Sequence, residues 1–199
     1  MPGSFPIALD LHGRRCLVVG QGEEAVLRAR SLMAEGAKVR VVAEQPTPSV
    51  YELVAAGAEV LQRSYRSEDF DDTWLVVLAD RDPALADRLA HETETRRIFY
   101  CAIDDPRVGS FSHLAIARAG IVFAAIGTHG EAPALGRRLR ELLSSLFDRA
   151  GLAEFASRHA TLRRKTPAAD RKAVLGADAA GLQLKGDLEI PSNARGDGS

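Results

Sequence analysis

The sequence predicts an α/β fold built on an open, mostly parallel sheet. Short apolar runs rich in valine alternate with amphipathic segments over the first hundred residues, which is the pattern of strand–helix–strand units. A glycine-containing turn joins the first apolar run to the first amphipathic segment. The chain has 199 residues, 46% of them hydrophobic, which suits one domain with a real core plus an appendage. Together these observations predict a Rossmann-like parallel sheet.

Each element has its own signal. Five apolar runs are typical of buried parallel strands, and three amphipathic segments between them are typical of helices. The strands are expected at 15–20, 37–43, 58–62, 73–80 and 97–103, and the helices at 23–36, 46–56 and 82–96. Gly36 is a helix-stop signal, and Asp82 followed by Pro83 is typical of a helix start. Right-handed crossovers then make a doubly wound sheet the expected arrangement.

The pattern changes after residue 104. Segments 110–118 and 121–128 predict two strands joined by a tight turn at Ala119–Gly120. Residues 131–149 predict an amphipathic helix with a stripe of leucines. This small β/α dimerisation element is too small to build its own core. We therefore expect it to pack against a second copy of the chain in a homodimer.

A glycine motif of the form G-x-G-x-x-A lies between the first predicted strand and the first predicted helix. It consists of Gly20, Gln21, Gly22, Glu23, Glu24 and Ala25. Gly20 permits the tight turn, Gly22 lets the backbone approach a pyrophosphate, and the helix N-terminus attracts the anion. The motif therefore predicts a dinucleotide site, with NAD as the cofactor. The alternative is a plain tight turn in an α/β sheet.

Acidic residues surround this predicted site. Glu44, followed by Gln45, comes directly after the second strand, where a carboxylate would bind the adenosine ribose hydroxyls and repel the 2′-phosphate of NADP. The alternative for Glu44 is a solvated loop residue. Glu23 and Glu24 suit the helix dipole but bring negative charge near a pyrophosphate, so we expect their side chains to point away.

Composition excludes several classes of function. The chain has 26 basic and 27 acidic residues, so neither nucleic acid nor a membrane is expected as a partner. Cys16 and Cys101 lie in apolar runs and are expected to be buried free thiols in a reducing compartment, the cytoplasm. No Cys/His cluster has the spacing of metal ligands, so no bound metal is expected.

Three regions are expected. Residues 1–109 form the Rossmann NAD-binding domain, and residues 110–160 form the dimerisation and helical region. Residues 161–199 are charged, rich in alanine and glycine, and without a sustained hydrophobic period, which predicts a largely flexible C-terminal tail.

Residues 1 to about 150 resemble precorrin-2 dehydrogenase, the amino-terminal module of siroheme synthases. The resemblance rests on PIALDLHGRRCLVVGQGEEA, GAKVRVVA, WLVVLADRD, RRIFYCAIDDP, GSF at 109–111, and RAGIVFAAIGTHGEAPALGRRLRELL at 118–143. It implies a Rossmann domain, a dimerisation element and the NAD-dependent oxidation of precorrin-2 to sirohydrochlorin. In some members of the family the same protein also inserts Fe²⁺, so iron insertion is a further expectation.

The resemblance also implies site residues. Asp104, at the end of the fifth strand, matches the family's proton-handling residue, which is also implicated in iron insertion; its alternative role is to cap the turn before Pro106. Thr128 matches a hydroxyl residue beside the tetrapyrrole cleft. Arg137 and Arg138 could bind the substrate's carboxylates or belong to a solvated helix face.

Several positions depart from the family pattern. Asp80 stands where the family commonly has a threonine near the cofactor, so the resemblance implies a carboxylate near the nicotinamide. Ala86 and Cys101 replace asparagines. These departures favour an alternative function, a non-catalytic carrier or sensor that binds NAD(H) or a tetrapyrrole on the same fold. Asp104, the candidate proton-handling residue, instead favours a catalytic function.

Overall fold

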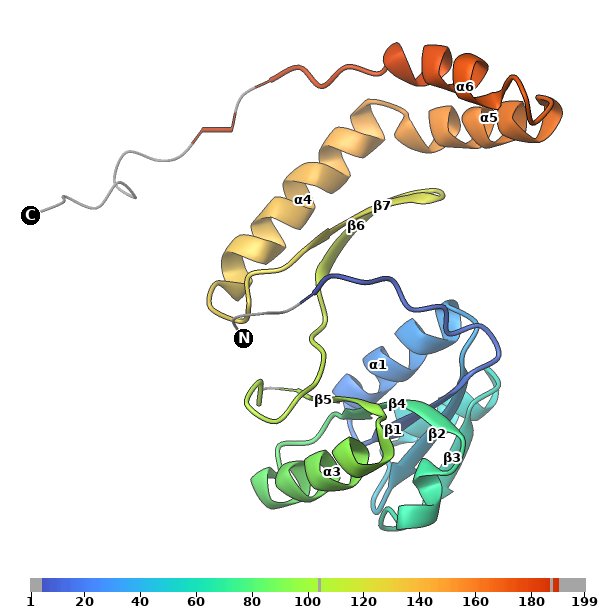
Figure 1. Cartoon of the computed structure of the whole chain (residues 1–199). Helices are drawn as coiled ribbons and strands as arrows, with labels where there is room; N and C mark the ends of the chain where they lie inside the picture. The colour runs from blue at the N-terminus through green and yellow to red at the C-terminus, as the bar shows by residue number, and fades with distance from the viewer. Residues whose placement is uncertain (1–4, 104, 187, 190–199) are drawn as a thin grey trace, which may run out of the picture. The chain divides into compact units, whose positions relative to one another are not determined.

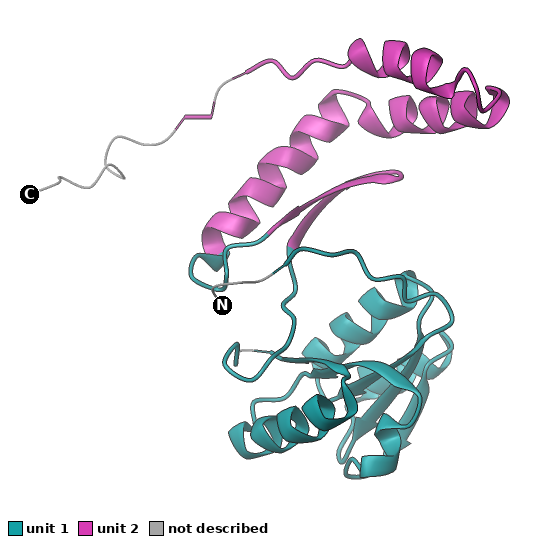
Figure 2. Cartoon of the chain, in the orientation of Figure 1, with its two compact units in different colours: residues 1–114, 127–133 teal, residues 115–126, 134–199 magenta. Residues whose placement is uncertain are grey.

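A computed structural model describes residues 5–103, 105–186 and 188–189 and divides the chain into two compact units (Figures 1 and 2). The first unit comprises residues 1–114 and 127–133, and the second comprises residues 115–126 and 134–199. The first contains a five-stranded parallel sheet in the order β3-β2-β1-β4-β5. Its strands are β1 (Arg15–Val19), β2 (Lys38–Ala43), β3 (Glu59–Gln62), β4 (Thr73–Leu78) and β5 (Phe99–Ala102). The predicted α/β fold class is thus confirmed.

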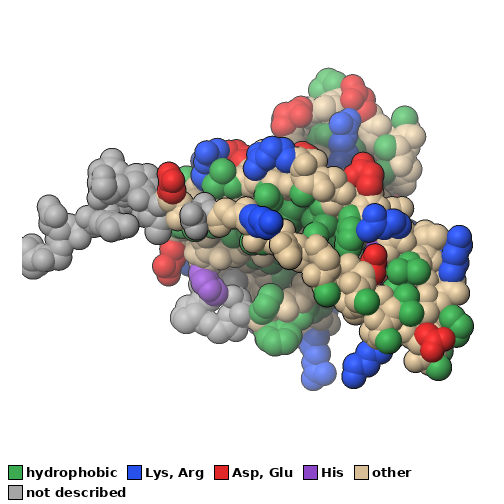
Figure 3. All heavy atoms as spheres, turned by 90° about the horizontal axis from the view of Figure 1, so that it is seen from above, with side chains coloured by type: hydrophobic (Ala, Val, Ile, Leu, Met, Phe, Trp, Pro, Cys, Tyr) green, Lys and Arg blue, Asp and Glu red, His purple; other side chains and the backbone are tan. Residues whose placement is uncertain are grey.

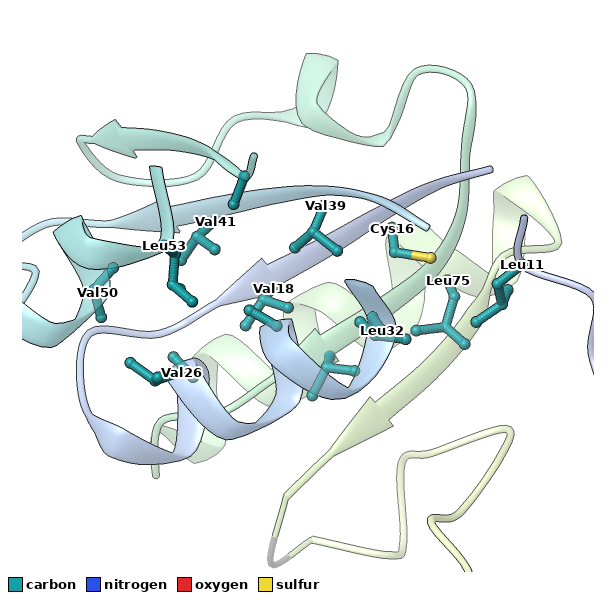
Figure 4. Packing of buried hydrophobic residues seen from close by; sticks show 14 residues of the cluster. Leu11, Cys16, Val18, Val26, Leu32, Val39, Val41, Val50, Leu53 and Leu75 are labelled. Atoms are coloured by element: carbon teal, nitrogen blue, oxygen red, sulfur yellow. The ribbon is translucent and has the colours of Figure 1, made fainter. Parts of the chain in front are cut away.

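Helices cover both faces of this sheet. On one face, α1 (Glu23–Ala34) packs through Ala25, Ala29 and Leu32 against alternate residues of the strands (Figure 4). On the other face, α3 (Pro83–Arg96) contributes Ala86 and Leu89 to a second cluster. Successive strand residues therefore point into different cores, which explains why the strand sequences are almost continuously apolar. Both cysteines are buried and free, as predicted.

The helix signals in the sequence have clear physical causes. Asp82 is the N-cap of α3, and its carboxylate accepts a hydrogen bond of 2.9 Å from the Leu85 N–H. Gly36 follows α1 at φ +78°, and a Cβ there would lie 2.5 Å from Nδ1 of His12. Only glycine fits that position without displacing the histidine.

The helix predicted at 46–56 is shorter than expected. It consists of α2 (Pro48–Tyr51) followed directly by the 3₁₀ helix η1 (Glu52–Val54). Two buried residues, Val50 and Leu53, anchor this segment to the core. A second 3₁₀ helix, η2 (Ser67–Phe70), precedes β4.

The second unit contains the predicted hairpin and three helices, but the first strand of the hairpin begins at Ala115 instead of residue 110 and its turn lies one residue later than predicted. The antiparallel strands β6 (Ala115–Ala119) and β7 (Val122–Ile126) are joined at Gly120 and Ile121. The helices are α4 (Pro133–Arg149), α5 (Leu152–Lys165) and α6 (Arg171–Ala180). Within the described residues, no helix is both long and apolar enough to cross a membrane.

The prediction of a flexible tail from residue 161 needs a correction, because residues 161–165 complete α5 and residues 171–180 form α6. Polar contacts hold α6 to α5: Nδ1 of His159 lies 2.7 Å from Oδ2 of Asp178, and Arg158 lies 3.7 Å from the same carboxylate. Such contacts join residues about twenty positions apart and produce no hydrophobic period. The sequence pattern therefore did not reveal this helix pair.

Candidate cofactor site

A cleft of about 570 Å³ opens at the carboxyl ends of the central strands. Strand order reverses direction between β1 and β4, which is where ligands bind in open α/β sheets. The cleft is lined by residues that follow four different strands, including Gly20 and Gln21 after β1, Glu44 after β2, Arg63, Ser64 and Tyr65 after β3, and Asp80 after β4. The structure therefore brings three of the predicted cofactor residues, Gly20, Glu44 and Asp80, to one cleft.

The two motif glycines are required for different reasons. A Cβ on Gly20 would lie 2.9 Å from the Cβ of Ala79 and 3.3 Å from that of Ala25, so close packing of the turn against β4 and α1 requires glycine. A Cβ on Gly22 would meet no atom of the described chain within 4 Å. The protein's own packing does not demand glycine at position 22, and the open space there suits the close approach of a cofactor's pyrophosphate.

The N-terminus of α1 lies beside this open space. Gly22 is the N-cap residue and has no side chain to occupy the first N–H groups of the helix. Those N–H groups and the helix dipole favour a bound anion. The backbone of this loop therefore fits the pyrophosphate of a dinucleotide.

Glu23 and Glu24 both have partners within the protein. Glu23 accepts a hydrogen bond of 2.7 Å from the Ser49 hydroxyl, and Glu24 accepts one of 2.7 Å from Nε of Arg28 one helical turn away. These contacts agree with the expectation that the two carboxylates turn away from the phosphates. At both positions a contact with the cofactor would come from the backbone.

Gln21 links three segments around the cleft. Its side-chain oxygen accepts the Gln45 N–H at 3.0 Å, and its carbonyl oxygen accepts the Thr47 N–H at 3.0 Å. Its own N–H donates to Oδ1 of Asp80 at 3.2 Å. Gln21 therefore fixes the glycine loop to the loops after β2 and β4. The sequence motif gives Gln21 no role of its own, because these long-range contacts leave no local signal.

The same bond gives Asp80 a structural role that the sequence did not suggest. Its carboxylate is directed to a backbone N–H of the glycine loop, and a charged acceptor strengthens such a bond. Asp80 also lines a second cleft of about 750 Å³, together with Ala102, Ile103 and Asp105 at the end of β5. Asp80 thus lies at the boundary between the two clefts.

Glu44 is the first residue after β2, and its exposed carboxylate accepts a hydrogen bond of 2.6 Å from the Ser64 hydroxyl. Ser64 is neutral, so this contact orients the carboxylate without cancelling its charge. One oxygen of Glu44 is thereby fixed, and the other can accept hydrogen bonds from ribose hydroxyls. The contact leaves Glu44 at the cleft with its charge intact, and its role in binding the ribose stays a prediction beside the alternative of a solvated loop residue.

A buried ion pair supports the same edge of the sheet. Asp69 is 1% exposed, and its two carboxylate oxygens each lie 2.7 Å from a terminal nitrogen of Arg63. Burial raises the pKa of Asp69, but hydrogen bonds from Arg63 and from the Arg66 N–H outweigh that effect, so the pKa lies below its usual value. Both partners are therefore charged at neutral pH.

An aromatic wall completes the cleft. The Tyr65 hydroxyl donates to Glu92 at 2.6 Å, and burial and this bond raise the pKa of Tyr65 to about 12. The Arg88 guanidinium lies over the Tyr65 ring, 4.9 Å from its centroid. Both side chains line the cleft, where they form a cation–π pair.

The remaining predicted residues lie elsewhere. Asp104, the predicted base, lies outside the described residues. Thr128 belongs to the first unit, and its carbonyl accepts the Glu131 N–H. Arg137 and Arg138 are exposed on α4, and Arg138 pairs with Glu141 at 3.6 Å, which is the solvated-face arrangement considered as the alternative. Substrate binding by these three residues stays a prediction.

The sheet order and the glycine loop at the switch point define a dinucleotide-binding protein of the Rossmann class. The model of the family described as "Putative NAD(P)-binding" matches residues 7–115. The chain belongs to this family. The match confirms the predicted NAD-type cofactor.

Curated relatives and a solved structure extend this result. The chain is 37% identical to siroheme synthase of Escherichia coli O1:K1 / APEC over 144 residues, and equally identical to that of Escherichia fergusonii. These matches cover 72% of this chain and 32% of each relative, so the chain spans about a third of their length. The structure of SirC, precorrin-2 dehydrogenase, is similar with a TM-score of 0.71 and 25% identity, covering 87% of this chain and 88% of the other. The resemblance stated from the sequence is confirmed.

Proposed function

We propose that the chain oxidises precorrin-2 to sirohydrochlorin with NAD. The observation that carries this proposal is the similarity to SirC, which extends over both units of the chain and not only over the cofactor domain. A generic Rossmann protein would share the sheet but not the hairpin and the helices that follow it. The cofactor cleft supports the redox part of the proposal.

The oxidation removes a hydride and a proton from the macrocycle. When bound, NAD supplies the nicotinamide ring that accepts the hydride. The chain's own residues bind the cofactor: the loop at Gly22 receives the pyrophosphate, and Glu44 accepts hydrogen bonds from the ribose. Asp104 accepts the proton as general base. The cleft after β4 and β5 holds the reacting part of the substrate.

The substrate carries carboxylates, which arginines bind well. The family resemblance makes Arg137 and Arg138 the candidates for this role, and it makes Thr128 the candidate hydroxyl residue beside the macrocycle. Iron insertion by the same site stays a prediction, as does the cytoplasmic location.

A homodimer forms part of the proposal. Large apolar side chains on the second unit remain exposed, among them Ile121 at 70%, Phe123 at 50% and Leu135 at 54%. Figure 3 shows hydrophobic side chains at the surface among charged ones. Exposed apolar groups of this kind mark interaction surfaces, and a second copy of the chain is the partner we assign. Sedimentation equilibrium tests this, and a monomer at micromolar concentration would contradict it.

The test of the function uses purified protein, NAD and enzymatically made precorrin-2 under anaerobic conditions without metal. We expect the absorption spectrum of sirohydrochlorin to appear in the wild type. Gly22→Asp should lose both activity and NAD binding, whereas Asp104→Asn should lose activity and keep NAD binding. Full activity in Asp104→Asn would remove the assigned base.

The same assay separates the enzyme from a carrier or sensor. Tight binding of NAD and tetrapyrrole without conversion would support the non-catalytic alternative. Among the departures from the family pattern, Asp80 favours that alternative most directly, because it brings a carboxylate to the cofactor site. Because Asp80 holds the glycine loop, its carboxylate is compatible with cofactor binding. Fe²⁺ added after conversion then tests iron insertion.

A further inference from the structure

Two oppositely charged residues meet at the cofactor cleft where β2 and β3 end. Ala43 and Gln62 are paired in the sheet register, so Glu44 and Arg63 follow at the same level. The Arg63 N–H donates to the Ala43 carbonyl at 2.9 Å. This bond continues the pairing of the two segments just beyond the ends of β2 and β3. Both residues line the cleft.

Arg63 is held in place by partners behind it. Nη1 donates to Asp69 and to the Ser64 carbonyl, and Nη2 donates to the second oxygen of Asp69. These bonds leave the Nε–H and one Nη2–H for a ligand. The guanidinium is thus fixed in orientation and retains donors suited to a phosphate.

Glu44 carries the opposing charge. Ser64, the neighbour of Arg63, fixes the Glu44 carboxylate at 2.6 Å without neutralising it. A ribose bound to Glu44 would present its 2′ position to a carboxylate, which repels a phosphate group there. The Asp69 carboxylate pairs with Arg63 at 2.7 Å and with Arg40 at 3.4 Å, so the charge of Arg63 is partly compensated before a phosphate approaches.

We propose that Arg63 is a latent site for the 2′-phosphate of NADP, kept closed by Glu44 and by the ion pair with Asp69. Arg63, Glu44 and Asp69 together then set the preference for NAD. The inference rests on cofactor binding at this cleft and not on the identity of the oxidised substrate. It can therefore be tested without any tetrapyrrole.

The experiment measures the affinities of NAD and NADP by isothermal titration calorimetry, with 2′,5′-ADP and 5′-ADP as smaller probes. Glu44→Gln removes the repelling charge and keeps the approximate size of the side chain. We expect its affinity for NADP and 2′,5′-ADP to rise about tenfold, as one charge-assisted contact allows, while that for NAD falls. Glu94→Gln, an exposed change on α3, serves as the matched control and should change neither affinity.

Arg63 is tested in the Glu44→Gln background. Adding Arg63→Met should abolish the gain in NADP affinity, and circular dichroism checks that this variant folds. Because the loss of Arg63 leaves Asp69 buried without its main partner, Asp69→Asn provides an independent test. It retains Arg63 and weakens the ion pair, so NADP affinity should rise even with Glu44 present.

The outcomes separate this inference from the proposed function. If the wild type binds NAD and neither Glu44→Gln nor Asp69→Asn gains affinity for NADP, the inference is wrong and the proposed function stands. A gain that persists in the Glu44→Gln/Arg63→Met variant would also overturn it. If the wild type binds neither NAD nor NADP, both the inference and the proposed function are wrong.

Discussion

The same substitution at the two glycines of the cofactor loop should affect different properties: stability at Gly20 and cofactor affinity at Gly22. In Gly20→Ala the new Cβ would lie 2.9 Å from the Cβ of Ala79, so β4 or the loop has to shift. Overpacking of this kind costs about 1–3 kcal/mol. In Gly22→Ala the methyl group meets open space, and the backbone at φ −115°, ψ −164° is allowed for alanine.

The stability of Gly22→Ala should therefore stay close to that of the wild type. Alanine leaves the unfolded chain less conformational freedom than glycine, which stabilises the folded protein by about 0.4–1 kcal/mol. Alanine is also a poorer N-cap residue than glycine, which destabilises the folded protein by a similar amount. The affinity for NAD should nevertheless fall by about tenfold or more, because the methyl group lies where the pyrophosphate approaches.

Urea unfolding and calorimetric titration with NAD measure the two effects separately. Gly20→Ala should shift the unfolding midpoint, and Gly22→Ala should shift only the dissociation constant. Unchanged NAD affinity in a folded Gly22→Ala protein would refute the assignment of this loop to the pyrophosphate.

Three further predictions concern the rest of the fold. The lowered pKa of Asp69 means that its ion pair stabilises the protein fully above the ordinary aspartate pKa of about 4 and is lost as the pH falls through the lower folded value. Acid unfolding should therefore be less steep in Asp69→Asn, and an identical pH profile would contradict this. Burial raises the pKa of the Cys16 and Cys101 thiols to about 11, so a thiol reagent at pH 8 should label neither until urea unfolds the protein; rapid labelling of the native chain would show that the thiols are accessible. Asp178→Ala removes the carboxylate that holds α6 to α5, and amide exchange should accelerate in α6 but not in α1; unchanged exchange in α6 would mean that other contacts hold it.

The central sheet could be predicted from the sequence because its signals are local. Valine-rich runs mark the strands. Gly36, at φ +78°, marks the end of a helix through its own backbone conformation, and Asp82 marks the start of another through a hydrogen bond three residues away. The glycine motif likewise marks the cofactor loop. Each of these signals depends on residues close together in the chain.

The supporting contacts of the site could not be predicted in the same way. Gln21 reaches residue 45 and residue 80, and Arg63 is fixed by a buried Asp69 whose charge would normally indicate an exposed loop. His159 and Asp178, which join α5 to α6, are 19 residues apart. In each case a polar contact across loops or helices decides the structure, and no hydrophobic period reports it.

The central claim is that NAD bound at the glycine loop takes the hydride from precorrin-2. The most direct measurement is a single turnover under anaerobic conditions, in which NADH and sirohydrochlorin are quantified together. We predict that they appear in equal amounts and at the same rate, and that Gly22→Asp forms neither. Sirohydrochlorin formed without NADH, or formed equally well by Gly22→Asp, would contradict the account.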